Sequence, residues 1–162
     1  MKKVTFLNLG KHPITNNFLD NPKPKKEFFY NLKLVFNNKT KLVSLANFVQ
    51  PRMMFNDTYA HRASASMTMQ TAYNKLSEKI KKKYKPKKIL EIGSNDGVFI
   101  KNFKNVKNIG VEPCKNLAKI TKKMGIETYA EFWNYKLSNK IKKKHGKIDL
   151  IYSANTISHI HN

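Results

Sequence analysis

The fold of this chain is decided by the stretch Ile89-Leu90-Glu91-Ile92-Gly93-Ser94-Asn95-Asp96-Gly97. Its apolar start predicts a short buried strand, and its two glycines predict a tight loop that leads into a helix. Glycine lets the backbone approach a ligand closely, and the free N–H groups of a loop and a helix start can bind that ligand. The stretch is not the full dinucleotide fingerprint, because Asn95 stands where the second glycine would be. A bulkier loop suits a ligand without a pyrophosphate.

Strands and helices alternate after this loop. Apolar runs predict strands over 108–112, 126–130 and 148–154, and helices are expected over 98–103, over 113–124 and up to residue 146. Pro113 suits a first helical turn, and Gly125 and Gly146 suit helix ends. The last apolar run is typical of a parallel strand that is buried on both faces. This alternation predicts an α/β fold with a Rossmann-like, parallel half-sheet.

The residues before this sheet have a different pattern. Aromatic and β-prone residues over Glu27–Phe36 and an apolar run over Lys41–Val49 flank Asn37-Asn38-Lys39-Thr40, which has turn chemistry. A hairpin is therefore expected here. Residues 16–26 contain two prolines and several lysines and are expected to form a loop.

A helix is expected between these two parts. Ser64 or Ser66 can cap its start, and Lys85-Pro86 ends it. The predicted domain organisation is a small β-rich module over 1–63, a linking helix over 64–86, and the N-terminal half of a Rossmann-like ligand-binding domain over 87–162.

Carboxylates gather at the predicted strand ends. Glu112 ends the second strand of the predicted sheet, roughly twenty residues after the start of the loop motif, the separation at which a carboxylate holds ribose hydroxyls. The chain has only 10 carboxylates against 32 basic side chains, yet Glu91, Asp96, Glu131 and Asp149 also lie at or beside strand ends. A ligand site is therefore predicted there. For Glu131 and Asp149, ordinary turn and cap roles remain an equal alternative.

These motifs resemble those of the C-methyltransferases that act on nucleotide-linked deoxysugars. The resemblance is carried by Leu90–Gly97, by Gly110-Val111-Glu112-Pro113, and by Asp149-Leu150-Ile151 with Asn155 and His159-Ile160. Weaker similarity in Leu9–Phe18 and Tyr59–Ser66 extends it over essentially the whole chain. Members of the family have an N-terminal zinc-binding module, a class I S-adenosylmethionine-dependent methyltransferase domain and a C-terminal domain.

The resemblance implies roles for individual residues, with S-adenosylmethionine as the cofactor. The loop residues that would line its methionine and ribose part are Gly93, Ser94, Asn95, Asp96 and Gly97. Glu112 would hold the ribose hydroxyls, Pro113 would lie beside the adenine, and Asn155 would border the cofactor near the acceptor. Tyr59 would face the sugar, so a nucleotide-linked deoxysugar is the implied substrate.

The chain also departs from this family. Asn37 and Thr40 stand where the family has a Cys-x-x-Cys pair, and Cys114 is the only cysteine, so zinc ligation by thiolate is not expected. His61 replaces a second tyrosine. The sequence stops before the family's remaining strands, C-terminal domain and Glu-His pair, which includes its general base. We therefore expect a truncated enzyme that binds cofactor but is inactive alone.

Three smaller expectations follow. The apolar edge of the fourth strand is expected to pair with a second copy or another polypeptide. Cys114 lies at a helix start. Either this position lowers its thiol pKa, or its side chain packs in the core. His159 and His161 form a His-x-His pair, but no third ligand is visible in the sequence, so no metal site is expected.

The formal net charge of +22 fits binding to nucleic acid or to an anionic surface. Lysines greatly outnumber the two arginines, Arg52 and Arg62, although specific phosphate and base recognition relies on arginine. A compositional bias is therefore favoured over a nucleic-acid role. No run approaches the roughly 20 apolar residues of a membrane helix, and Met1–Leu7 is a poor signal peptide, so a cytoplasmic protein is expected. The alternatives are a basic nucleic-acid-binding or nucleic-acid-modifying methyltransferase, and a non-catalytic remnant or interaction module.

Overall fold

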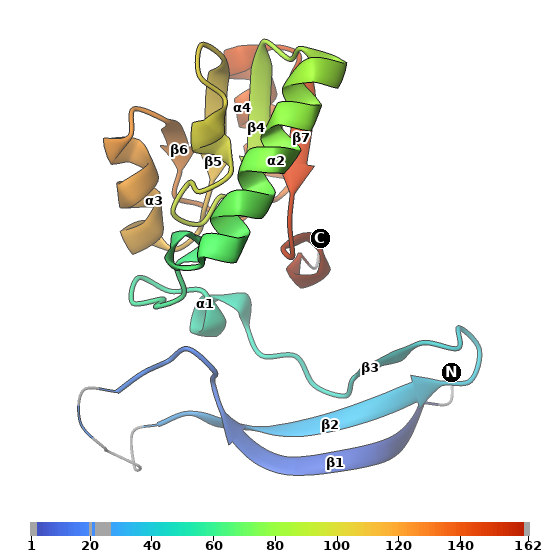
Figure 1. The fold of residues 1–162 in the computed structure, drawn as a ribbon. Coiled ribbons are helices and arrows are strands. Elements are labelled where there is room, and N and C mark those ends of the chain that lie inside the picture. The colour runs from blue at the N-terminus through green and yellow to red at the C-terminus, as the bar shows by residue number, and fades with distance from the viewer. Residues whose placement is uncertain (1–2, 20, 22–26, 161–162) are drawn as a thin grey trace. The chain divides into compact units, whose positions relative to one another are not determined.

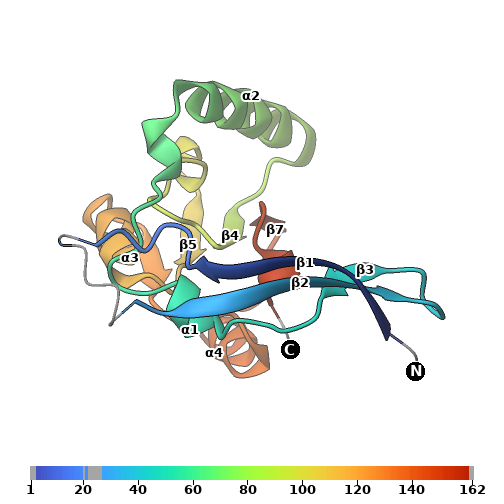
Figure 2. The same ribbon diagram turned by 90° about the horizontal axis from the view of Figure 1, so that it is seen from below.

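The computed structural model describes residues 3–19, 21 and 27–160, and it divides into two compact units, 1–55 and 56–162 (Figures 1 and 2). The division lies at Phe55, whereas the sequence suggested residue 63. Residues after Phe55 go with the second unit because their polar groups bond to it: the Asn116 side chain donates to the carbonyl of Tyr59 (2.9 Å), and Ser64 donates to Asp96.

The first unit contains an antiparallel sheet in the order β1-β2-β3 and a short helix, α1 (Pro51–Met54). The strands are β1 (Lys3–Pro13), β2 (Phe29–Asn37) and β3 (Val43–Leu45). The predicted hairpin is confirmed, with Phe36 opposite Val43. Sequence patterns did not indicate β1, because its pairing with β2 is interrupted between Thr5 and Leu7 and again between Asn8 and Lys11. Such bulges disrupt the two-residue period of a strand. Most of the predicted loop over 16–26 lies outside the described residues.

Asn37 organises the turn between β2 and β3. Its side-chain oxygen accepts hydrogen bonds from the backbone N–H groups of Lys39 (3.0 Å) and Thr40 (3.2 Å). Lys41, in the left-handed region at φ 59°, donates its N–H to the carbonyl of Asn37 (2.8 Å). An asparagine side chain that accepts from the following backbone mimics a backbone turn and stabilises it locally.

Replacing Asn37 with alanine is expected to destabilise this turn by about 1 kcal/mol, since two exposed hydrogen bonds are lost. The Lys39 and Thr40 amides should then exchange faster with solvent by NMR. Asn37→Asp keeps the acceptor and is the matched control, with exchange close to that of the wild type. Unchanged exchange in Asn37→Ala would contradict the structural role of this side chain.

The second unit has a four-stranded parallel sheet in the order β6-β5-β4-β7, as the α/β prediction requires. The strands are β4 (Lys88–Ile92), β5 (Lys107–Val111), β6 (Glu127–Tyr129) and β7 (Leu150–Ser153). The helices are α2 (Met67–Tyr84), α3 (Lys115–Lys123) and α4 (Tyr135–His145), with single 3-10 turns η2 (Ala63–Ala65), η3 (Ile100–Asn102) and η4 (Ile157–His159). The α/β class, with a small β module before it, is thus confirmed.

Alternate residues of β4 bury into two separate clusters. Leu90 and Ile92 pack with Leu137 and Ile141 of α4, while Ile89 packs with Ile80 of α2 and with two buried phenylalanines. Strand residues alternate between faces, so Glu91 lies on the same face of the sheet as Ile89. Helices α2 and α4 thus cover opposite faces of the sheet. The carboxyl ends of the strands are not on either covered face, so a site can form there.

Three local expectations were wrong. The helix expected over 98–103 is only the turn η3, because the Asn102 side chain donates to the carbonyls of Val98 (3.0 Å) and Phe99 (2.9 Å), and such local bonds compete with a helix. Helix α3 begins after Cys114 rather than at Pro113. β7 is not buried on both faces, since it lies at an edge of the described sheet and Ile151 is 58% exposed.

The start of α2 is set by Ser66, whose hydroxyl accepts the N–H of Met69 (3.2 Å), as one of the two predicted caps requires. None of the described helices is both long enough and apolar enough to cross a bilayer.

Candidate functional site

The loop after β4 is held in an unusual backbone conformation. Gly93, Asn95 and Gly97 all have positive φ, of 75°, 49° and 81°. The N–H groups of Gly93 (2.8 Å) and Ser94 (3.1 Å) both donate to the carbonyl of Val111, the last residue of β5. Glycine and asparagine tolerate these angles better than other residues. The loop therefore turns sharply over the carboxyl ends of β4 and β5.

Glu112 is fixed beside this loop. Its side chain is 5% exposed, and its two oxygens accept the N–H groups of Asn95 (2.8 Å) and Cys114 (2.9 Å). Burial raises the pKa of Glu112, those hydrogen bonds oppose the rise, and the charge of Asp96 adds to it. The Cys114 side chain also hydrogen-bonds to this carboxylate and lowers the pKa of Glu112. Glu112 is thus a buried carboxylate fixed by three hydrogen bonds, and a carboxylate has about four acceptor positions in all.

The Ser94 side chain faces the sheet interior rather than the loop surface. A Cβ placed on Gly110 of β5 would come within 3.0 Å of its hydroxyl oxygen and 3.1 Å of the Thr128 hydroxyl. Ser94 is 1% exposed, and among the described residues its hydroxyl has no hydrogen-bond partner. The backbone of Ser94 is also engaged within the loop, since its N–H donates to Val111 (3.1 Å) and its carbonyl accepts the N–H of Gly97 (2.9 Å). The structure therefore gives Ser94 a role in shaping the loop.

Asn95 and Asp96 hold a segment that comes from before α2, residues 57–66, which we call the strap. The Asn95 side chain accepts the N–H of Ala63 (2.9 Å) and donates to the carbonyl of His61 (3.2 Å). Asp96 accepts the backbone N–H of Ser64 (3.3 Å) and its hydroxyl (2.5 Å). These side chains thus hold the strap against the loop. They bring residues of the strap into contact with loop residues that are 32 or more positions later in the chain.

The strap also carries the predicted acceptor-facing residue, Tyr59. Its carbonyl accepts the Asn116 side chain at the start of α3, and its ring lies edge-on to that of His61, with centroids 6.4 Å apart. The strap's outer end is held by an exposed ion pair between Asp57 and Lys115 (3.0 Å). Tyr59 is thus brought to the same end of the sheet as Glu112. Ser64 and Asn116 were missed by sequence reasoning, since no local signal marks contacts over such separations.

The segment after β7 reaches the same loop. The Ser153 hydroxyl donates to the carbonyl of Ile92 (3.0 Å), and Asn155 follows in the left-handed region at φ 53° with its side chain exposed. Thr156, which sequence reasoning missed, packs directly on Gly93: a Cβ added there would lie 2.1 Å from its hydroxyl oxygen. The structure therefore brings Asn155 and Thr156 to the loop. Pro113 follows Glu112 at the same end of the sheet.

Glu91 is a buried acid under this loop. It is 4% exposed, and among the described residues one of its oxygens lacks a hydrogen-bond partner. Burial raises its pKa well above the ordinary 4.5, a hydrogen bond from the N–H of Ile100 opposes the rise, and the charges of Glu112 and Asp96 increase it. The unfolded chain therefore loses this proton first as pH rises, so the ionised acid costs folding free energy at higher pH.

Glu91→Gln is expected to increase the free energy of unfolding relative to the wild type, by an amount that grows as pH rises above about 4.5. Urea unfolding at pH 5 and pH 8 measures this difference, and the exposed Glu131→Gln is the control, for which no such growth is expected. An equal effect of Glu91→Gln at both pH values would show that Glu91 titrates alike in the folded and unfolded chain.

The other acids and Cys114 have structural roles. Asp149 accepts the N–H groups of Lys87 and Lys88 (both 2.9 Å) at the amino edge of the sheet, and Glu131 forms an exposed ion pair with Lys140 (2.8 Å). Cys114 is 1% exposed, and burial followed by the charge of Glu112 raises its pKa rather than lowering it. Cys114 therefore packs in the core and does not have a lowered thiol pKa.

The described residues do not fit a zinc ion. No cysteine occurs in residues 1–55, and no group of three or more potential ligands among His, Cys, Asp and Glu gathers anywhere in the described parts of the chain. At the position of the expected Cys-x-x-Cys pair, the oxygen of Asn37 accepts the turn N–H groups instead. His159 lies in the turn η4, and His161 is outside the described residues.

Comparison with known proteins adds to this geometry. A family model described as "Methyltransferase domain" matches residues 59–162, and one described as "Putative zinc binding domain" matches residues 1–55. The chain is 24% identical over 163 residues to the C-methyltransferase NovU of Streptomyces niveus. That match covers 97% of this chain and 39% of the relative, so the chain spans about two-fifths of the relative's length.

Proposed function

The chain belongs to the methyltransferase-domain family, and on that premise we propose that it binds S-adenosylmethionine at the carboxyl ends of β4, β5 and β7. The observation that carries the proposal is Glu112, a buried carboxylate that the N–H groups of Asn95 and Cys114 hold beside the glycine loop. It would accept one ribose hydroxyl at its remaining acceptor position and the vicinal hydroxyl in place of the Cys114 side chain. The positive φ of Gly93 and Gly97 fits a ligand that lies close against the loop backbone.

The residues of this chain would bind and orient the cofactor. Glu112 would accept the ribose hydroxyls, the loop backbone would face the methionine part, and Pro113 would lie beside the adenine. When bound, S-adenosylmethionine supplies an electrophilic methyl group. Asp96 would act on the strap rather than on the cofactor, because all of the described hydrogen bonds of its carboxylate come from Ser64. Alignment of methyl donor and acceptor is the main demand of such a transfer.

We propose further that the acceptor is a carbon of a nucleotide-linked deoxysugar. This is supported by the resemblance in the loop and Val-Glu-Pro motifs, by the relative whose name is C-methyltransferase, and by the position of Tyr59 on the strap. A carbon acceptor also needs a base. In the described site, Glu112 and Asp96 are already engaged by backbone N–H groups and by Ser64, so we propose that this chain binds cofactor without methylating the sugar by itself.

The acceptor class is tested by calorimetric titration of the chain, saturated with S-adenosylhomocysteine, with a deoxysugar linked to a nucleoside diphosphate. Binding is expected, and Tyr59→Phe should weaken it several-fold. Tyr135→Phe is the matched control, because that side chain is 81% exposed on α4. If the chain binds S-adenosylhomocysteine but not the deoxysugar nucleotide, the sugar acceptor is wrong while the cofactor site stands.

We also propose that the edge of β7 pairs with a second copy of the chain. In the described sheet, β7 bonds only to β4, and exposed apolar edges invite pairing. Light scattering should give a mass above that of the monomer, and Ile151→Lys should lower it, since Ile151 is 58% exposed on this edge. A monomer at all concentrations would contradict this pairing.

A further inference from the structure

Lysines gather at one edge of the second unit, the edge opposite the glycine loop. Because all four strands are parallel, their amino ends lie at this edge, and helices α2, α3 and α4 end there (Figure 1). The last turns of these helices carry Lys81–Lys83, Lys122–Lys123 and Lys142–Lys144. Lys101, Lys104 and Lys107 line a hollow at the start of β5. We call these eleven lysines the lysine edge.

The lysine edge carries far more positive charge than its carboxylates offset. Three of its members form ion pairs: Lys81 with Glu78, and Lys107 (2.9 Å) and Lys144 (2.5 Å) with Glu127. Across residues 78–147, all of which the structure describes, the other eight have no ion pair. The buried acids Glu91, Asp96 and Glu112 lie toward the other end of the strands. Glu78, Glu127 and Asp149 also lie at the lysine edge, so this edge carries an excess of positive charge but is not free of carboxylates.

The helix dipole explains only part of this arrangement. It favours lysines in the last turn of a helix, which accounts for those on α2, α3 and α4. It does not account for Lys104, in the loop before β5, or for Lys107 at the first residue of that strand. Lys104 and Lys107 both line the hollow. They therefore add positive charge at the same edge where the last turns of the helices already carry lysines.

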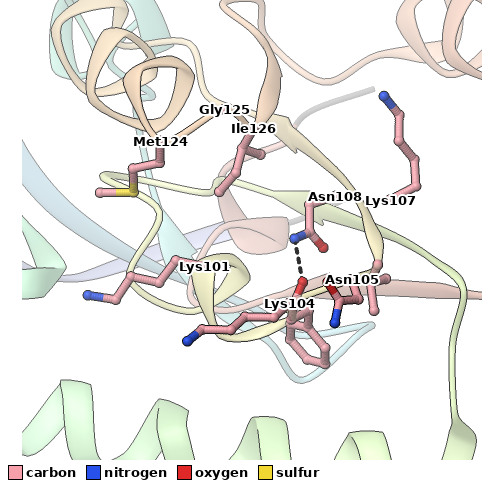
Figure 3. A pocket seen from close by; sticks show the side chains of 10 residues that line it. Lys101, Lys104, Asn105, Lys107, Asn108, Met124, Gly125 and Ile126 are labelled. Carbon is pink, nitrogen blue, oxygen red and sulfur yellow. Dashed lines mark hydrogen bonds between the residues drawn. The ribbon is translucent and has the colours of Figure 1, made fainter.

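The hollow itself has an unused polar atom. Its volume is about 310 Å³, and Lys101, Lys104 and Asn108 are among its lining residues (Figure 3). The Asn108 amide donates to the carbonyl of Phe103 (2.8 Å), while its buried oxygen has no partner among the described residues. A buried acceptor without a partner is costly. That oxygen has almost no exposed surface, so the hollow offers a ligand its lysines rather than this atom.

We propose that the lysine edge binds the phosphate backbone of a single-stranded nucleic acid, with Lys101, Lys104 and Lys107 around the hollow among its phosphate contacts. Lysine suits phosphate as a point charge and does not read bases as arginine does. Exposed Tyr84 (58%) lies at the same edge and offers an aromatic ring on which a base can stack. A lipid surface has no bases to stack on this ring.

The bound nucleic acid would be a partner and not the methyl acceptor. The glycine loop lies at the other end of β4, whose five residues span roughly 16 Å. A nucleic acid bound at the lysine edge therefore does not present its bases to the glycine loop. This inference does not depend on the proposed deoxysugar acceptor, and the two can fail separately.

The test is fluorescence anisotropy with a labelled single-stranded oligouridylate at several salt concentrations. One variant replaces Lys101, Lys104, Lys122 and Lys123 with glutamine. The matched control makes the same change in charge at four exposed lysines further from the edge: one is in the first half of α2, two are in the first turns of α3 and α4, and one is in α4 and pairs with Glu131 beyond the carboxyl end of β6. These are Lys75, Lys115, Lys136 and Lys140. The edge variant should lose about tenfold or more in affinity, and its salt dependence should weaken by up to about 3 in slope, at roughly 0.7 per lost phosphate contact. The control should change little.

Three results would overturn the proposal. Equal losses of affinity in the two variants would mean that the total positive charge of the chain, and not the lysine edge, attracts the oligouridylate. No oligouridylate binding by the folded wild type would exclude this partner. Edge-dependent binding to vesicles that contain phosphatidylglycerol, tighter than binding to oligouridylate, would assign the edge to a membrane surface instead.

Discussion

Glu112→Ala is expected to abolish measurable binding of S-adenosylhomocysteine, with a loss of about 100-fold or more. Each hydrogen bond to a charged group contributes roughly 1.5–3 kcal/mol, and about 1.4 kcal/mol corresponds to a tenfold change in affinity. Glu112 would accept two such bonds from the ribose. It is 5% exposed and already fixed by two backbone N–H groups, so no ordering of this side chain is needed on binding.

The matched control is Glu131→Ala, an exposed carboxylate two residues after β6 that pairs only with Lys140 among its described contacts. It should leave the affinity unchanged. Because Glu112→Ala also leaves two buried N–H groups without acceptors, its folding is checked by circular dichroism and by its unfolding midpoint. A folded Glu112→Ala chain that binds S-adenosylhomocysteine as the wild type does would contradict the assignment of the ribose site.

Gly93→Ala is expected to destabilise the second unit by about 2–5 kcal/mol and to abolish cofactor binding. A side chain at positive φ costs roughly 1–2 kcal/mol, and overpacking a tight contact costs about 1–3 kcal/mol more. Gly93 has φ 75°, and a Cβ there would lie 2.1 Å from the Thr156 hydroxyl oxygen. Neither the loop nor the segment after β7 can keep its present position with that atom added. Urea unfolding measures the loss.

Gly125→Ala separates the two causes. Gly125 has φ 79°, but nothing lies within 4 Å of a Cβ placed on it, so only the backbone cost of about 1–2 kcal/mol applies. Removing the Thr156 side chain in a Gly93→Ala/Thr156→Gly double variant should recover part of the steric loss. If Gly93→Ala and Gly125→Ala destabilise equally, the packing of Thr156 on Gly93 is absent in solution.

The parallel sheet was predictable because its strands are short apolar runs separated by clear turn residues. The same holds for the position of Glu112, since the separation between the glycine loop and the acid is fixed by one strand-helix-strand unit. Strand β1 was not predictable in this way, because two irregularities in its pairing with β2 break the alternation of its residues. The predicted helix over 98–103 is only the turn η3, because the Asn102 side chain bonds to nearby carbonyls. The sequence does not show whether such a side chain will form these local bonds or stay in a helix.

The candidate site was predicted only in part. The sequence indicated that the glycine loop and Glu112 lie at neighbouring strand ends, but not that Asn95 and Asp96 turn their side chains to the strap. Contacts such as Asp96 to Ser64 and Gly93 to Thr156 join distant segments, so no local periodicity encodes them. Cys114 shows the same limit: its place at a helix start allowed a lowered pKa, and burial beside Glu112 raises it instead.

The S-adenosylmethionine site that we propose at the carboxyl ends of β4, β5 and β7 is best tested by calorimetric titration of the purified chain with S-adenosylhomocysteine. This ligand has the same ribose, adenine and amino acid parts. We expect saturable binding at one site per chain. A chain with a cooperative unfolding transition that gives no heat of binding and no shift of that transition with ligand would contradict it.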